Sequence, residues 1–590
     1  MQVSNVWRRA SARCAGVVLR SLAATIVMVS TAMAAVAPRV VFTDVPSGPV
    51  SGGEGNQGAY LSIFGRNFGS PDGLGTRTKV TIGGVEVANY RSLGPSQVAD
   101  RLGLQQLTVQ VGALTGKAAG QAWPVRVLVD GVASNVDVTF TPNPGRVLFV
   151  ALNGNDATAA ANDINHPWRH LQDAAGGAYG ALRAGDQVVL RGGTWQDTLG
   201  IDGTWLRFGN DPSKKGSAPT GAVGTGWIHI TRYPGPIGAN APEDVHYVTP
   251  ANQRGGIQGP WSAIRGVSGE YIAISNLRIE VDATAKSDAA PINTQYSAGP
   301  WQITNNELGP WPSTLAAPGN AKAAGISGEG NGVVIRGNHI HDIACAKGRP
   351  TNPLENHGIY IDDDGRYDIG FNVFERITGG NGLQIYTNGG FSKTTNNVSF
   401  HHNIVDGVGK HGINLADGSG RNIKVFDNLV LNTQFSGLRM NSVDLIGAQV
   451  YNNTFYNTSL HGPSDYYGAV SNEWNLKAGS VDFANNIFWP SAGSGYTGGT
   501  VPFTGKEGSW AHNLWFGGAD EVPAFAQAPV TLDPKFVSAG SDFHLRAGSP
   551  AINAGSAAVS PTVVDDLDGR RRPKAGGYDI GTYEAPSAAR

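Results

Sequence analysis

The first pattern along the chain is an alternation of apolar and polar residues between Pro38 and Pro142. It is clearest in Ala59-Tyr-Leu-Ser-Ile-Phe64, Lys79-Val-Thr-Ile82 and Val125-Arg-Val-Leu-Val129, which are separated by glycine-rich turns. Alternation with a period of two residues is typical of strands that bury one face. The pattern therefore predicts an antiparallel β-sandwich over residues 38–142.

A second pattern begins farther along, where short apolar runs meet an asparagine at intervals of 25 to 34 residues. The repeating residues are Asn276, Asn306, Asn338, Asn372, Asn403, Asn428, Asn453 and Asn486. Units of this length, without helical periodicity, fit the turns of a parallel β-solenoid with three short strands each. We expect the asparagine side chains to stack along the solenoid axis as a hydrogen-bonded ladder.

The solenoid is expected to span residues 146–500, with its apolar ends covered. An amphipathic helix that begins in the segment Pro167–Ala175 is predicted to cap the first end. The chain after the solenoid, residues 501–590, is expected to form a cap or tail. Within it Asp568 and Arg570 are expected to be structural.

Several of these segments resemble known families. Leu61–Gly69, Val80–Gly84 and Gly131–Asn135 are similar to the IPT/TIG immunoglobulin-like family, which implies a sandwich that acts as a spacer or contacts carbohydrate. Phe149–Asp156 and Gly185–Gly193 resemble the first part of right-handed parallel β-helix proteins of the pectate-lyase-like superfamily. Many members of that superfamily are polysaccharide lyases or glycoside hydrolases. The resemblance implies an all-β fold, a right-handed parallel β-helix preceded by an immunoglobulin-like sandwich.

The amino terminus has the features of a cleavable secretory signal over residues 1–34. Four arginines precede the apolar run Ser21–Met33, and Ala32-Met-Ala34 follows the pattern of a cleavage site. The run is shorter than the about 20 residues that a membrane-spanning helix needs. We therefore expect a secreted or periplasmic product with no integral membrane segment after signal cleavage.

Composition excludes several other classes of protein. Of 590 residues 82 are glycine and only 15% are charged, which argues against a disordered chain or a coiled coil. Loss of the signal removes four arginines and no acidic residue, so the formal charge changes from −2 to −6. A nucleic-acid-binding protein would need a basic excess, so no nucleic-acid partner is expected. Cys345 is the one cysteine of the expected mature chain, so it can form no internal disulfide. We expect the protein to be a monomer.

A column of glycines marks one strand in each coil and assigns its two faces. The glycines are Gly325, Gly358, Gly382, Gly412, Gly437 and Gly468. Because side chains alternate along a strand, the residue that directly follows each of these glycines should face the interior. The inward residues are Ile326, Ile359, Leu383, Ile413 and Leu438. The outward residues are Glu329, Tyr360, Gln384, Tyr386, Asn414, Arg439 and Asn441, and His357, Asn381 and His411 lie at the turns just before the strands.

This outer face contains the groups that β-elimination of a uronic-acid polymer requires. His411 and His357, with an ordinary pKa of about 6.5, are candidate bases, and Lys410 is a third. Arg439 is expected to hold the substrate carboxylate with two hydrogen bonds. Tyr360 is expected to protonate the leaving oxygen.

The remaining residues of the face are expected to bind sugar rings and hydroxyl groups. Flat aromatic rings suit the faces of sugars, and amides and carboxylates suit their hydroxyls. The predicted substrate-binding residues are Asn381, Gln384, Tyr386, Asn414, Asn441 and Glu329.

The run Asp362, Asp363 and Asp364 is the densest acidic cluster in this region. Carboxylates are the ligands that Ca²⁺ prefers, so a calcium site that neutralises a uronate is predicted here. Asp362 and Glu329 also occupy the same outward position of adjacent coils, about 5 Å apart, as the two carboxylates of retaining glycosidases do. The sequence therefore predicts a secreted polysaccharide-degrading enzyme, first of all a polysaccharide lyase. A glycoside hydrolase, a C5 epimerase and a non-catalytic carbohydrate-binding surface protein are the alternatives.

Overall fold

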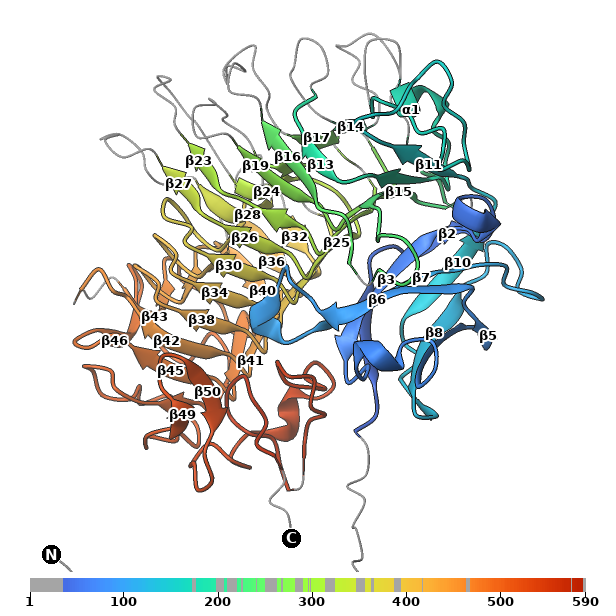
Figure 1. Ribbon diagram of the computed structural model, residues 1–590. Coiled ribbons are helices and arrows are strands. Elements are labelled where there is room, and N and C mark those ends of the chain that lie inside the picture. Colours follow the sequence, from blue (N-terminus) through green and yellow to red (C-terminus); the bar gives the residue numbers. More distant parts are fainter. Residues whose placement is uncertain are drawn as a thin grey trace, which may run out of the picture. The chain divides into compact units, whose positions relative to one another are not determined.

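Three long parallel sheets wind around one apolar interior in the computed structural model of the chain (Figure 1). The structure describes residues 36–171, 177–197, 206–208, 220–223, 226–239, 241–249, 263–266, 269–281, 290–294, 297, 299–313, 324–345, 356–361, 365–386, 394–415, 418–462, 467–574 and 576–586. The predicted signal over residues 1–34 lies outside these ranges and stays a prediction.

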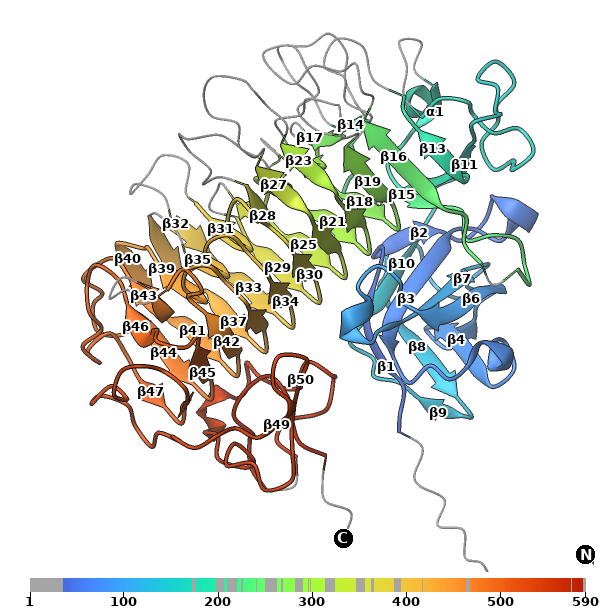
Figure 2. The ribbon, with the colours of Figure 1, turned by 60° about the vertical axis from the view of Figure 1, so that its left-hand side comes forward.

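Each complete coil of the solenoid contributes one strand to each sheet, and the coils at the two ends contribute to fewer sheets. Figure 2 shows these strands as parallel arrows. The twelve-stranded sheet consists of β11 (Val147–Val150), β12 (Gln187–Leu190), β15 (Ile228–Arg232), β18 (Ile272–Ser275), β21 (Trp301–Thr304), β25 (Val333–Arg336), β29 (Tyr367–Gly370), β33 (Val398–His401), β37 (Lys424–Phe426), β41 (Ala448–Tyr451), β44 (Val481–Ala484) and β47 (Trp510–Ala511). The eleven-stranded sheet consists of β13 (Gly193–Trp195), β16 (Val245–Thr249), β19 (Arg278–Val281), β22 (Glu307–Leu308), β26 (His339–His341), β30 (Val373–Glu375), β34 (Ile404–Asp406), β38 (Leu429–Leu431), β42 (Thr454–Thr458), β45 (Ile487–Pro490) and β48 (Leu514–Trp515). The ten-stranded sheet consists of β14 (Leu206–Phe208), β17 (Ile264–Gly266), β20 (Ile292–Asn293), β24 (Ala324–Gly328), β28 (His357–Ile361), β31 (Leu383–Ile385), β35 (Ile413–Leu415), β39 (Leu438–Met440), β43 (Gly468–Asn472) and β46 (Gly495–Gly498).

The residues before the solenoid form two smaller, mainly antiparallel sheets around their own apolar core. One sheet has the order β1 (Arg39–Thr43), β3 (Tyr60–Arg66), β7 (Gln105–Gln110) and β6 (Asn89–Pro95). The other has the order β2 (Ser47–Pro49), β10 (Thr139–Asn143), β8 (Trp123–Val129), β4 (Thr78–Ile82) and β5 (Val85–Glu86), with β9 (Val132–Ala133) beside β8. The core includes Ile63 and Leu107 from one sheet and Val80 and Val127 from the other. This is the sandwich that the alternating pattern predicts.

Minor elements complete the described chain. Short extra sheets pair β23 (Trp311–Ser313) with β27 (Ile343–Cys345), β32 (Thr394–Asn396) with β36 (Ser419–Arg421) and β40 (Asp444–Ile446), and β49 (Phe536–Ser538) with β50 (Asp542–Leu545). The helical elements are the single α-helix of the described ranges, α1 (Gly177–Ala181), and 3₁₀ turns at Glu54–Asn56, Pro71–Gly73, Asp100–Leu102 and Ala557–Val559. In the described ranges, none of the helices is long and apolar enough to span a membrane.

The cap helix and the end of the solenoid differ from the expectations. Residues 167–171 are not helical, and Trp168 instead forms a β-bridge with Val150. Trp168 is buried in the core at this end, together with Leu171 and with Ala178 of α1, whereas residues 172–176 lie outside the described ranges. The coils also continue past residue 500, since β47 and β48 extend two of the sheets.

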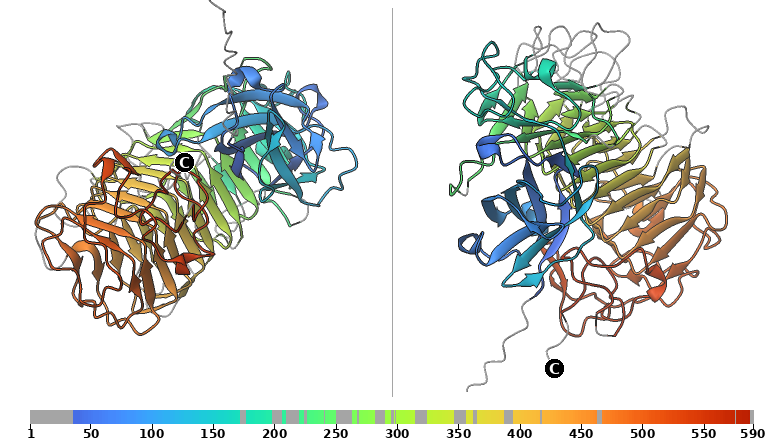
Figure 3. Two further views of the ribbon diagram at one scale, coloured as in Figure 1. Left: turned by 90° about the horizontal axis from the view of Figure 1, so that it is seen from below. Right: turned by 90° about the vertical axis from the view of Figure 1, so that its right-hand side faces the viewer.

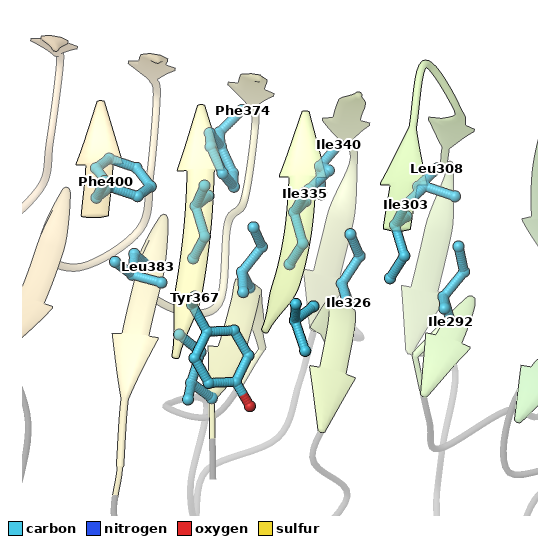
Figure 4. Packing of buried hydrophobic residues seen from close by; sticks show 14 of the residues in the cluster. Ile292, Ile303, Leu308, Ile326, Ile335, Ile340, Tyr367, Phe374, Leu383 and Phe400 are labelled. Carbon is cyan, nitrogen blue, oxygen red and sulfur yellow. The ribbon is translucent and has the colours of Figure 1, made fainter. Parts of the chain in front are cut away.

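The interior is filled by one or two apolar residues from each strand of the three long sheets, stacked coil upon coil. Figure 4 shows Ile303, Ile335 and Phe400 from one sheet opposite Ile340 and Phe374 from another, and these side chains belong to one continuous core. The predicted inward residues are all buried, namely Ile326, Ile359, Leu383, Ile413 and Leu438. The face assignment from alternation is therefore confirmed, and Figure 3 shows the coils following one another in chain order.

The asparagine ladder exists, with one correction at its start. From Asn306 to Asn513 each side-chain amide donates to the Oδ1 atom of the asparagine in the next coil, at 2.9 to 3.1 Å. Each backbone N–H of the ladder residues also donates to that same oxygen. Asn276 is one residue out of this register, because the N–H of Leu277 donates to Asn306 in its place.

A left-handed turn before each ladder residue explains the polar sequence there. The residues that precede the ladder asparagines have φ between 51° and 69°, a region that asparagine, aspartate and glycine tolerate best. They are Asn305, Gly337, Phe371, His402, Asp427, Asn452, Asn485 and His512. The turn aims the next side chain along the axis, so the ladder and the turn depend on each other.

The sandwich and the solenoid share buried polar contacts. Asp44 accepts hydrogen bonds from Ser275 Oγ at 3.1 Å and Asn276 Nδ2 at 3.0 Å, and burial raises the pKa of Asp44 to about 7. The backbone N–H and C=O of Tyr60 bond to the side-chain amide of Gln187 at 2.8 and 2.7 Å. The two parts therefore form one unit in which neither exposes these groups to water.

Loss of one ladder amide should destabilise the whole stack. Asn403→Ala leaves the backbone N–H of Asn372 without its acceptor and removes the hydrogen bonds that the Asn403 amide donates to Ile369 O and Asn428 Oδ1. A buried donor or acceptor without a partner costs about 1–3 kcal/mol. We expect the free energy of unfolding, measured with urea, to fall by roughly 2–5 kcal/mol. The control is Asn396→Ala, where the lost amide donates to Thr394 O within its own strand. An equal loss in both variants would contradict the role of the ladder.

Candidate functional site

The ten-stranded sheet brings the predicted outward residues into one column. Tyr360 lies opposite Gln384, Gln384 opposite Asn414, and Asn414 opposite Arg439 in successive strands. The glycine column allows this close stacking. A Cβ atom at Gly382 would lie 2.6 Å from Gly412 O and 2.7 Å from a methyl group of Val405, so a side chain there would push the coils apart.

The inner part of this site is a buried polar layer, although Gln384 and Asn414 were predicted to lie on the outer, sugar-binding face. The residues of the layer are His357, Asn381, Gln384, His411 and Asn414, each at most 7% exposed. The Nδ2 atoms of Asn381 and Asn414 both donate to Gln384 Oε1, at 2.6 and 2.7 Å. Asn381 also accepts from the N–H of His411 at 3.0 Å and donates its own N–H to His357 Nδ1 at 3.1 Å.

This network changes the roles of two predicted sugar ligands. Both groups of the Gln384 amide are engaged, because its Nε2 atom donates to Ile385 O at 3.0 Å. Asn381 is engaged through its Oδ1 and Nδ2 atoms. These two amides are therefore placed to position His357, His411 and Asn414. Asn414 Oδ1 is buried without a hydrogen-bond partner among the described residues.

Above the buried layer lies a half-buried rim from consecutive coils. The rim consists of Tyr360, Tyr386, Lys410, Arg439 and Asn441. The ring of Tyr360 stacks on His357, with centroids 5.6 Å apart, and on Tyr386 at 6.2 Å. The rim therefore presents flat rings at one end and two cations and an amide at the other.

Two residues of the next coil complete the rim and were not singled out by the sequence. Glu473 accepts a hydrogen bond from Arg439 Nε at 3.1 Å and another from Thr500 Oγ1 at 2.6 Å. Trp474 is 38% exposed, and its indole N–H donates to Asn441 Oδ1 at 3.0 Å. Both follow the end of β43, so alternation within the strand could not assign them a face. The signal available was an exposed tryptophan in a polar segment.

His411 is held as a neutral imidazole. Burial, and after it the positive charges of Arg439 and Lys410, place the pKa of His411 well below its ordinary value of 6.5. Its ring packs against Phe435 and Tyr467, with centroids 5.4 and 6.0 Å away. The Nδ1 atom of His411 has no hydrogen-bond partner among the described residues. The site therefore keeps a proton acceptor ready at neutral pH.

The predicted acidic groups are mostly outside the described residues. Asp362, Asp363 and Asp364 fall in the gap after β28, so the calcium site and the carboxylate pair with Glu329 stay predictions. Glu329 is half-buried, and its backbone oxygen accepts from Thr294 Oγ1 at 2.7 Å. Within the described ranges no group of three or more His, Cys, Asp or Glu side chains is arranged to hold a metal ion.

Comparison with known proteins supports the fold. The family described as "Right handed beta helix region" matches residues 319–504, which include the whole site. The winding sheets and this match make the chain an all-β protein with a right-handed parallel β-helix. No match was found among curated proteins.

Three solved structures are similar at low identity. They are the A-module of the Azotobacter vinelandii mannuronan C-5 epimerase AlgE6 (14% identity, TM-score 0.36, 60% of this chain and 90% of that chain), the Agl-KA catalytic domain (15%, 0.33, 75% and 74%) and a mannuronic acid specific polysaccharide family 6 lyase from human gut microbiota (16%, 0.28, 60% and 78%). All three likenesses are weak, so the chemistry has to be inferred from the residues of this chain.

The charge environment of His411 can be measured directly. Arg439→Gln removes a positive charge near the imidazole, so the protonated form becomes less unfavourable and the pKa of His411 should rise. The pKa is followed by NMR of ¹³C-labelled histidines, with the signal assigned by its loss in His411→Gln. The control is Arg421→Gln, whose guanidinium pairs with Asp444 in another sheet. An unchanged pKa in Arg439→Gln would refute the coupling.

Proposed function

We propose that this protein is a polysaccharide lyase that cleaves a uronic-acid-containing glycan by β-elimination at the rim of the ten-stranded sheet. One observation supports the proposal above all others. A neutral imidazole, His411, lies buried beside two cations, Arg439 and Lys410, and two coils before it Tyr360 stacks on Tyr386. β-Elimination needs this combination of a base, a cation for the carboxylate and an acid for the leaving group.

The cations account for the choice of an anionic sugar. The side chain of Arg439 is fixed through Nε by Glu473, and we assign its guanidinium to the carboxylate of the uronate, together with Lys410. Neutralising that carboxylate makes the adjacent C5 hydrogen more acidic. The bound carboxylate also offsets the positive charges of Arg439 and Lys410, which lower the pKa of His411. The pKa of His411 therefore rises when substrate is present, and His411 becomes a stronger base.

The reaction itself moves two protons and breaks one bond. We assign removal of the C5 proton to His411, whose buried ring the substrate reaches when the side chains packed against it, Phe435 and Tyr467, move aside. The electron pair left at C5 forms the double bond between C4 and C5. The bond from C4 to the glycosidic oxygen breaks, and that oxygen receives a proton from the hydroxyl of Tyr360. The ring of Tyr360 is kept in place by its stacking between His357 and Tyr386. The product is a shortened chain with an unsaturated uronate at its new end.

Substitution of the proposed base His411, of the carboxylate-binding Arg439 or of the proposed acid Tyr360 should lower the turnover rate. His411→Ala is expected to lower kcat by about 10²-fold or more, the usual effect of losing a general base. Arg439→Lys is expected to lose activity as well, since a point charge cannot replace a planar fork with two hydrogen bonds. Tyr360→Phe removes the proton donor and should lower kcat with little change in KM. The rates are measured as chain ends formed from a uronate polymer.

Matched controls separate chemistry from folding. His166→Ala and Arg376→Lys change the same residue types in exposed ion pairs outside the ten-stranded sheet, and should keep wild-type rates. Full activity in folded His411→Ala and Arg439→Lys would overturn the assignment. A glycosidase would instead lose turnover in Glu329→Gln and Asp362→Asn. The calcium prediction is tested by chelation with EDTA followed by addition of Ca²⁺, which should restore any activity that the chelator removes.

A further inference from the structure

We propose a second carbohydrate site, which binds an uncharged saccharide unit, in a cavity far along the chain from the rim. The cavity measures about 370 Å³, within the 300–1,000 Å³ typical of small-molecule sites. It is bounded by the sandwich at Arg101–Gly103, by β34 and β38 of the eleven-stranded sheet, and by the tail at Ser541–His544 with Asp568 and Tyr583. None of these elements contributes to the rim or to the buried layer beneath it.

The floor of the cavity is apolar, and its walls are polar. Leu102, Ile404 and Leu429 form the apolar part, and each is at most 3% exposed. Tyr583 and Asp542 are partly exposed beside it. A surface of this kind matches a sugar ring, which has an apolar face of C–H groups and a periphery of hydroxyls.

The charged groups of the cavity are already paired, which selects against a charged ligand. Both ring nitrogens of His544 bond to carboxylates, Nδ1 to Asp542 at 2.6 Å and Nε2 to Asp568 at 2.8 Å. Hydrogen bonds to Asp568 and Asp542 raise the pKa of His544, which favours the protonated ring that donates through both nitrogens. Asp568 also pairs with Arg570 at 2.7 Å.

The remaining cation of the cavity wall is compensated in the same way. Arg101 reaches Glu375 at 2.6 Å and Asp406 at 2.9 Å. An anionic ligand would lie beside the carboxylates of Asp542 and Asp568, and a cationic ligand beside Arg101, so a neutral ligand meets the least repulsion.

The paired carboxylates can still accept hydrogen bonds from hydroxyl groups. Each carboxylate has about four lone-pair positions, and the backbone N–H and the ring of His544 both bond to the Oδ1 atom of Asp542. Its side chain is 42% exposed at the cavity. Fixed acceptors above an apolar floor favour a saccharide with neighbouring hydroxyls.

Binding is tested with the full chain and a panel of neutral disaccharides and monosaccharides, with galacturonate and mannuronate as charged counterparts. Titration calorimetry should show a neutral sugar bound more tightly than either uronate. Asp542→Ala should weaken that binding about tenfold or more, because a hydrogen bond to a charged acceptor is worth that much. The control is Asp533→Ala, because Asp533 likewise accepts the N–H of the second residue after it but does not line the cavity.

A second variant keeps the test valid if Asp542→Ala disturbs the tail. Ser541→Trp places a bulky ring at the exposed edge of the cavity and should abolish neutral-sugar binding, whereas Ala539→Trp nearby should not. Turnover of a uronate polymer should be unchanged in both, which separates this site from the rim. Binding of no neutral sugar, or binding that survives Ser541→Trp, would overturn the proposal and leave the lyase assignment untouched.

Discussion

The stacking of coils at hydrogen-bonding distance is the constraint on which the rest of the molecule depends. Every strand of the solenoid must pair with the strands before and after it, so the coils have no freedom to separate locally. The asparagine ladder fixes this spacing at the corner of each coil, since one Oδ1 atom receives both an amide and a backbone donor. The glycines fix it at another corner, where a Cβ atom would meet the next coil.

The same constraint builds the candidate site. A fixed spacing places residues of four coils in one column, so Tyr360, Gln384, Asn414 and Arg439 keep a constant register. The buried amides can then position each other across coils rather than bind water. Rigid placement of this sort is what general-base catalysis requires, because a proton acceptor must meet its substrate in a defined geometry.

Much of the fold could be predicted because its signals repeat. A single asparagine says little, but eight at similar spacing indicate stacked coils, and alternation after each glycine assigned the interior correctly at Ile359 and Leu383. The exceptions are local. Asn276 has the right residue type but occupies the turn position, and Trp168 packs as an extended residue although its segment has a helical pattern.

The site could be predicted less well. Alternation along a strand indicates which face a side chain occupies, but not whether solvent reaches that side chain. Gln384 and Asn414 point away from the core as expected, yet neighbouring amides cover them. Glu473 and Trp474 lie beyond the strand end, where alternation gives no information. The cavity around His544 is lined by three parts of the chain that lie far apart in the sequence. A local sequence pattern cannot predict that such segments lie together.

The central claim is that bond cleavage at the rim proceeds by elimination. The most direct test is the product formed from a uronate polymer by the wild-type protein. We expect the ultraviolet absorbance of the C4–C5 double bond to rise in step with the number of new chain ends. Chain ends that appear without this absorbance would show hydrolysis, and inversion at C5 without new chain ends would show epimerisation; either result would contradict the account.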